Sequence, residues 1–159
     1  MAKTATLLHH KSAATDLAYV MAGAEEHEAA LQLMEQLAVQ ALNTRTQLEK
    51  LGLIIPAEEL ARRLGVSPEL VWAAQAKGRI FTLETSDGRK LFPAFFANPA
   101  LAGEELEAIS TQLADLSDSG KWQFFTTPKF SLRGQTPLEA IAQGEFDKVR
   151  ISAAGFAGR

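Results

Sequence analysis

The sequence predicts a mainly α-helical fold with one small β-hairpin. Two observations predict it. Apolar residues recur at helical spacing through most of the 159 residues, and one stretch of alternating β-branched and aromatic residues surrounds an Asp-Gly turn signal. Apolar residues make up 47% of the chain and charged residues 22%, which is typical of a globular protein with a buried core.

Composition excludes several classes of protein. The chain has no cysteine, which rules out disulfides, cysteine nucleophiles and cysteine-ligated metals. Its longest apolar runs are far shorter than the ~20 residues of a membrane-spanning helix. The first residues lack the apolar region of a signal peptide. We therefore expect a soluble cytoplasmic protein without a membrane partner.

The N-terminal third predicts a flexible segment followed by a long helix. Residues 1–23 lack a clear period, and we expect them to be flexible. Residues 24–55 contain a helix that ends before Gly52. Six apolar or small residues of this helix recur every three or four positions and so share one helix face. This face is expected to pack on the rest of the chain, to form a homodimer, or both. These positions are Met34, Leu37, Ala41, Thr44, Leu48 and Leu51.

Residues 56–77, PAEELARRLGVSPELVWAAQAK, predict two short helices joined by a tight turn. Leu60, Ala61 and Leu64 mark the inward face of the first helix, and Val66 is expected to be buried. Gly65 can take the left-handed conformation that ends this helix, while Ser67 and Pro68 are a good N-cap and first residue for the second. The pattern favours a DNA-binding helix-turn-helix, and a plain corner of two helices is the alternative.

A β-hairpin is predicted directly after the second helix. RIFTLET (79–85) and RKLFPAFF (89–96) are the two strands, Asp87-Gly88 is a favoured hairpin turn, and Pro93 forces the return strand either to end or to lie at a sheet edge. Over about residues 56–96 the sequence resembles the winged helix-turn-helix of excisionase-type and MerR-type regulators, and we expect residues 56–98 to form that domain.

This arrangement predicts a surface for double-stranded DNA. Gln75 could contact an adenine edge, and Ser67 with the neighbouring amides could hold a phosphate. Trp72 either faces outward or packs under the hairpin, and a solvated surface of mixed charge is the alternative for the whole set. The candidate DNA-binding residues are Arg62, Arg63, Ser67, Glu69, Trp72, Gln75, Lys77, Arg79, Arg89 and Lys90.

The last third is predicted to be helical. Residues 99–120 form a linking helix with Leu106, Ile109, Leu113 and Leu116 inward, ended by Asp118-Ser119-Gly120. In residues 121–159, Thr136, Pro137 and Glu139 predict a capped short helix, and Gly144 ends it. A final helix of about ten residues follows, with an apolar face of Phe146, Val149, Ile151, Ala153 and Ala154.

The stretch LRGQTPLEAIAQG (132–144) resembles the toxin-binding domain of the Xre/MbcA/ParS antitoxin family. The resemblance implies an antitoxin-like helical domain over residues 121–159. It also implies a partner toxin of the RES or ADP-ribosyltransferase-like type, and repression of the chain's own operon. Basic side chains of this region are the candidate partner-binding residues: Lys129, Arg133, Lys148, Arg150 and Arg159.

No catalytic residue, metal site or cofactor is expected. His9, His10 and His27 lack metal-ligand spacing, and the chain has no phosphate-binding or nucleophile motif. The sequence thus predicts a sequence-specific DNA-binding transcriptional regulator, dimeric and antitoxin-like, that represses its own operon. The alternative is an adapter that holds a partner protein through its C-terminal domain without specific DNA binding.

Overall fold

The computed structural model describes the backbone of residues 2–158 and the side chains of residues 23–40 and 44–158. The fold is mainly helical with a small antiparallel sheet, which confirms the predicted fold class. The chain divides into two units, Met1–Leu42 and Asn43–Arg159. The segments predicted over residues 56–98, 99–120 and 121–159 all lie within the second unit.

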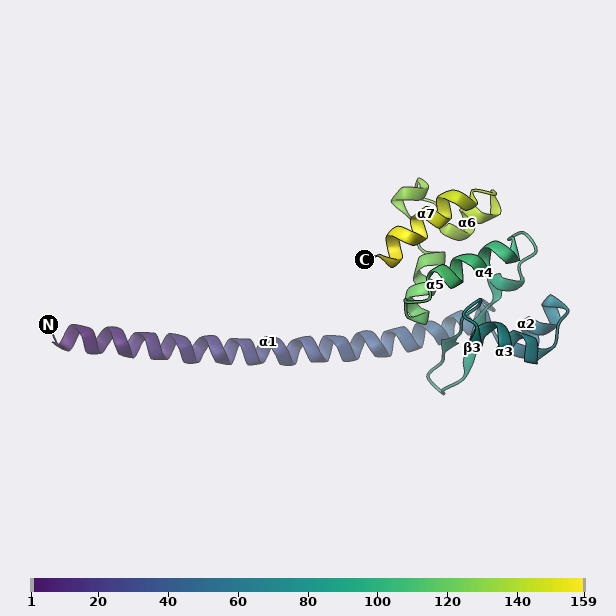
Figure 1. Cartoon of the computed structure of the whole chain (residues 1–159). Coiled ribbons are helices and arrows are strands. Elements are labelled where there is room, and N and C mark those ends of the chain that lie inside the picture. The colour runs from purple at the N-terminus through teal and green to yellow at the C-terminus, as the bar shows by residue number, and fades with distance from the viewer. Residues whose placement is uncertain (1, 159) are drawn as a thin grey trace. The chain divides into compact units, whose positions relative to one another are not determined.

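Helix α1 spans Ala2–Lys50 (Figure 1). It begins at Ala2 rather than near Ala24, so the backbone of residues 2–23 is helical where the sequence predicts a flexible segment. These residues include six alanines and no proline, and alanine has the highest intrinsic helix propensity. The side chains of residues 23–40 are exposed. Within the second unit, Leu48 of the same helix packs against a small apolar cluster made by Ile54, Leu83 and Leu91.

Helices α2 (Ala57–Leu64) and α3 (Pro68–Ala76) form the predicted pair. Leu60 and Ala61 of α2 are buried, as are Val71 and Ala74 of α3. Leu64 and Val66 were expected inside but are 44% and 40% exposed. That expectation is wrong because α2 ends at this point, and no described element covers this end of the pair.

Three short strands form one antiparallel sheet in the order β1-β3-β2. Strands β2 (Leu83–Glu84) and β3 (Lys90–Pro93) form the predicted hairpin, with Glu84 opposite Lys90, but both are shorter than the strands predicted at 79–85 and 89–96. Pro93 is the last residue of β3, which is the central strand and not an edge. Strand β1 (Ile54–Ile55) pairs with the other edge of β3 and was not predicted. Two residues are too few to show the alternation by which a strand is recognised.

Helices α4 (Gly103–Gln112) and α5 (Asp118–Thr126) replace the single linking helix predicted over residues 99–120. The predicted helix end at residues 118–120 is instead the start of α5. The Ser117 side chain caps α5 by accepting a hydrogen bond of 3.1 Å from the Gly120 amide. A short 3-10 helix, η1 (Ala94–Ala97), connects β3 to this region.

The chain ends with η2 (Phe130–Leu132), α6 (Pro137–Ala142) and α7 (Phe146–Ala157). The capping box predicted at α6 is confirmed: the Glu139 amide donates to Thr136 Oγ1 at 3.1 Å, and the Thr136 amide donates to Glu139 Oε2 at 3.4 Å. Val149 and Ala153 of α7 are buried as predicted. Ile151 and Ala154 are exposed, because they lie off the helix face that packs on α4 and α6.

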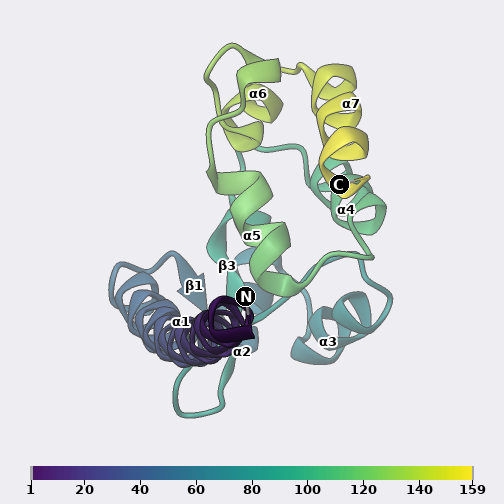
Figure 2. The same cartoon turned by 90° about the vertical axis from the view of Figure 1, so that its left-hand side faces the viewer.

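One apolar cluster joins the part of the second unit that carries α2, α3 and the sheet to the part that carries α4 to α7. Phe81, at the start of the hairpin, stacks on Phe125 of α5 with ring centroids 6.1 Å apart, and the cluster continues to Val149 of α7. Figures 1 and 2 show α4 to α7 gathered to one side of the region that carries α2, α3 and the sheet. Among the helices described, none combines the length and apolar character that crossing a bilayer requires.

Candidate nucleic-acid interface

The turn between α2 and α3 has the geometry that the sequence predicts. Gly65 lies in the left-handed region at φ 70°, and the Val66 amide donates to the Ala61 carbonyl at 3.0 Å. This bond closes the end of α2 and turns the chain sharply. The Ser67 side chain then accepts from the Leu70 amide at 3.4 Å, and Pro68 occupies the first position of α3. Ser67 therefore caps α3, as expected.

The outward face of α3 combines one acid with mostly apolar side chains. Glu69, Leu70 and Ala76 are exposed, and Ala73 and Gln75 are partly exposed. Gln75 is the one candidate on this face with both a donor and an acceptor for a base edge. Contact between this face and DNA would thus depend on shape and on flanking cations more than on base contacts.

Trp72 packs against the hairpin instead of pointing away from it. Its ring meets that of Phe92 edge-on, with centroids 5.0 Å apart, and the side chain stays 39% exposed. Trp72, Arg89 and Lys90 line a shallow hollow of about 360 Å³ between α2, α3 and the hairpin. The structure therefore brings these three candidates together.

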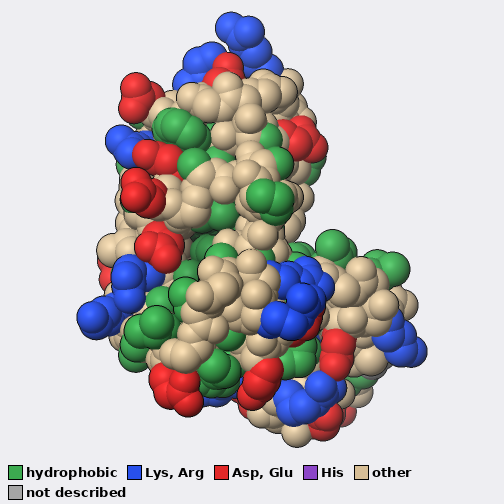
Figure 3. All heavy atoms as spheres, turned by 90° about the vertical axis from the view of Figure 1, so that its right-hand side faces the viewer, with side chains coloured by type: hydrophobic (Ala, Val, Ile, Leu, Met, Phe, Trp, Pro, Cys, Tyr) green, Lys and Arg blue, Asp and Glu red, His purple; other side chains and the backbone are tan. Residues whose placement is uncertain are grey.

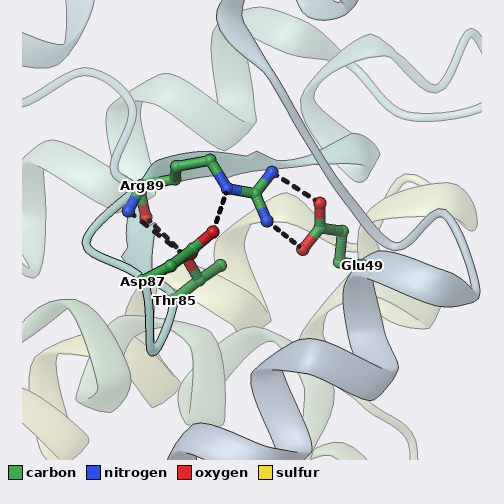
Figure 4. A network of polar contacts seen from close by, with 4 residues as sticks. All are labelled: Glu49, Thr85, Asp87 and Arg89. Carbon is green, nitrogen blue, oxygen red and sulfur yellow. Dashed lines mark hydrogen bonds and ion pairs between the residues drawn. The ribbon is translucent and has the colours of Figure 1, made fainter.

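Arg89 is held by an ion-pair network at the turn end of the hairpin (Figure 4). Its guanidinium donates to both carboxylate oxygens of Glu49 at 2.7 and 2.9 Å, and to Asp87 at 2.8 Å. These contacts raise the pKa of Arg89, with Glu49 the main cause. The Thr85 hydroxyl and Arg89 lower the pKa of Asp87. Arg89 thus ties the hairpin to the last turn of α1 and has two carboxylates beside it.

Arg62 and Arg63 share one carboxylate. Arg62 binds Glu59 through two hydrogen bonds of 2.6 and 3.0 Å, and Arg63 Nε binds the same group at 2.9 Å. The two arginines lower the pKa of Glu59 from 4.5 to about 2, and Glu59 raises that of Arg62. Arg63 also lines a different depression, beside Phe95 and Trp122. The ten candidates therefore do not form one continuous basic surface.

Three of the candidate cations are free to meet an anion. Lys77, Arg79 and Lys90 are exposed and form no ion pair with any described residue. Lys77 caps the end of α3, Arg79 follows it, and Lys90 lies on the hairpin. Figure 3 shows one face of the molecule on which blue basic groups alternate with red acidic ones.

The predicted partner-binding residues differ in their contacts: some form ion pairs, one lies over an aromatic ring and one is exposed. Arg150 donates to both oxygens of Glu105 at 2.5 and 3.2 Å, which ties α7 to α4, and Lys148 pairs with Glu145 at 3.0 Å. The Lys129 ammonium lies 4.4 Å from the centre of the Phe156 ring. Arg133 is exposed at a positive φ of 56°. Arg159 lies outside the described residues.

The sequence analysis missed the carboxylates that pair with the candidate DNA-binding arginines Arg62, Arg63 and Arg89. Glu59 could have been found, because it lies three and four residues before Arg62 and Arg63, the spacing of helical ion pairs. Glu49 lies forty positions from Arg89, and no local pattern connects the two. The side chains of His9 and His10 lie outside the described part.

Within the described residues, no group of three or more histidine, aspartate or glutamate side chains could hold a metal ion. Comparisons with protein-family models, with curated proteins and with solved structures find no match to this chain.

Proposed function

We propose that this chain is a DNA-binding regulator that holds a duplex against α3 and the β2–β3 hairpin. The observation that carries the proposal is the combination of a tightly turned helix pair with a three-stranded sheet whose last two strands form a projecting hairpin. In such an arrangement the second helix can enter a major groove while the hairpin lies along the adjacent backbone.

Electrostatics supports a binding mode based mainly on phosphates. The free cations Lys77, Arg79 and Lys90 flank α3 and the hairpin, and the outward face of α3 carries few groups that distinguish bases. Phosphate contacts release counterions, so the affinity should fall steeply as salt rises. Arg89, bound by Glu49 and Asp87, contributes less than its position on the hairpin suggests.

A titration of a fluorescein-labelled duplex, followed by anisotropy at two salt concentrations, tests the proposal. The double variant Arg79→Glu/Lys90→Glu should bind at least about tenfold more weakly and reduce the salt slope by roughly two. Arg133→Glu/Lys148→Glu removes the same formal charge from the C-terminal helices and is the matched control. Equal loss in both variants, or no binding by the unaltered chain at low salt, would refute a DNA site at α3 and the hairpin.

We further propose that the regulator is antitoxin-like and dimeric. The support is the resemblance of residues 132–144 to the Xre/MbcA/ParS toxin-binding domain, together with exposed apolar side chains of α1 such as Met34 and Leu37. A toxin of the RES or ADP-ribosyltransferase-like type encoded next to this chain should co-purify with it. A neighbouring toxin that remains active when the two are co-expressed would contradict the antitoxin role.

One observation favours the adapter alternative. Phe130 and Ile151 are large apolar side chains at 103% and 74% exposure, and both line a depression of about 400 Å³ on the C-terminal helices. Exposed apolar groups of this kind mark protein-binding surfaces. A chain that retains its protein partner but shows no salt-dependent binding to DNA would be an adapter.

A further inference from the structure

The second unit contains a large apolar groove away from α3 and the hairpin hollow. Its volume is about 820 Å³, within the range of about 300–1,000 Å³ typical of small-molecule sites. The end of α1, the 3-10 helix η1, α5 and α6 contribute its walls, through Leu48, Phe95, Trp122 and Leu138. Phe95 and Trp122 stack with ring centroids 5.8 Å apart, which gives the groove a flat aromatic wall.

The polar groups of this groove are mainly hydrogen-bond donors. Arg63 uses only Nε to bind Glu59, so both of its Nη atoms lack a partner among the described residues. The Asn98 side chain accepts from the Ala100 amide through Oδ1, which leaves its NH₂ group free. The Trp122 indole N–H also has no described partner. No aspartate or glutamate lines the groove.

We propose that this groove binds a small monocarboxylate with an apolar body, such as a medium-chain fatty acid. The apolar walls would bury the hydrocarbon, and the Arg63 guanidinium would bind the carboxylate at the rim. Charge complementarity argues for this ligand: Glu59 is shared by Arg62 and Arg63, so the cluster keeps one net positive charge, and no acid lines the groove. The head group of a cationic amphiphile would meet repulsion and unpaired donors there. The proposal does not depend on DNA binding.

Tryptophan fluorescence can follow binding at the groove itself. The chain has two tryptophans, and Trp72→Phe leaves Trp122 as the only one. In this background, decanoate should change the emission saturably and bind at least about tenfold more tightly than 1-decanol, the neutral molecule of the same length.

Arg62 supplies a matched control for the charged group. Both arginines bind Glu59, but only Arg63 lines the groove. Arg63→Gln should weaken decanoate binding about tenfold, and Arg62→Gln less than about twofold, in Trp72→Phe protein whose thermal unfolding shows that it is folded.

Three outcomes would overturn the proposal. The first is equal affinity for decanoate and decanol. The second is equal loss in Arg62→Gln and Arg63→Gln. The third is a decanoate signal that only accompanies the dissociation of protomers in sedimentation, which would make the groove an interface between copies of the chain.

Discussion

At the scale of single residues, carboxylates occupy several of the arginines near the helix pair and the hairpin. Glu59 holds two arginines and Glu49 holds a third, so half of the six Lys and Arg side chains between residues 56 and 93 already have a carboxylate partner. A count of basic residues in this region would overstate its attraction for an anion, because a neighbouring carboxylate offsets part of each charge.

The Glu59 pairs predict a pH dependence of stability. The pKa of Glu59 is lowered to about 2 in the folded chain, so its contribution is complete above the unfolded value of 4.5 and is lost as the pH falls towards 2. Glu59→Gln should therefore lower Tm by a few degrees at pH 7 and by progressively less below pH 4.5. Scans of both proteins across this range test it, and a Tm difference that does not depend on pH would contradict it.

Individual residues also show what the sequence could and could not predict. Ser67, Thr136 and Glu139 cap their helices through contacts three residues away, and Pro68 favours the first helical position by its fixed φ, so the starts of α3 and α6 were predictable. The prediction that Asp118-Ser119-Gly120 ends a helix was wrong. Ser117 caps α5 there, and burial of Phe124 and Phe125, which no local pattern shows, holds that helix on the core.

At the scale of elements, α1 is the part of the chain with the fewest described packing partners. Its exposed side chains include Leu31, Leu33, Met34 and Leu37, and Met34 and Leu37 belong to the set with heptad-like spacing. A single helix in water gains little stability without a packed face. The heptad-like spacing makes a second copy of α1 the partner that we propose.

Dimerisation through α1 should be sensitive to charged substitutions at Met34 and Leu37. Met34→Glu/Leu37→Glu should convert a dimer to a monomer, because like charges would face each other across the seam. Gln32→Glu/Gln36→Glu adds the same charge on a different side of the helix and should leave the dimer intact. Light scattering after size-exclusion chromatography measures both masses, and a monomeric unaltered chain would refute dimerisation through α1.

A second element-scale prediction concerns the tie between α1 and the hairpin. Glu49→Gln removes the bidentate partner of Arg89 and leaves Asp87 as the carboxylate still bound to it, so the net charge beside the proposed DNA surface becomes more positive. The affinity for duplex DNA should rise about two- to fivefold at low salt, in the direction opposite to Arg79→Glu/Lys90→Glu. The anisotropy titration detects the change, and weaker binding would show that Arg89 must stay paired to hold the hairpin in place.

The sheet shows which secondary-structure elements could be predicted from the sequence and which could not. The hairpin was predictable because Thr85, Asp87 and Gly88 close it locally, with Gly88 at φ 81°. Strand β1 depends on Ile54 and Ile55 meeting Pro93 and Phe92, which lie almost forty positions later. The groove was missed for the same reason, because Leu48, Arg63, Phe95 and Trp122 come together only in the folded unit.

At the scale of the whole second unit, one core holds the helix pair, the hairpin and the C-terminal helices together. Phe125 is fully buried and contacts Phe81, Phe95 and Phe124. Phe125→Ala should destabilise the unit by about 3–5 kcal/mol. Urea unfolding measures this loss. In a chain with Phe125 intact, the midpoint should be the same when Trp72 is the single reporter (Trp122→Phe) and when Trp122 is the single reporter (Trp72→Phe). Separate midpoints for the two reporters would show that the halves unfold independently.

The shared aromatic core has a consequence for protein engineering. Asn98 to Ala100 form an exposed connection that resembles a linker, yet the side chains before and after it interlock. A protease nick there should leave two fragments that stay bound to each other until they are denatured. Neither fragment could be transplanted into another protein as a ready-made module, because each would lose the aromatic rings that complete its interior.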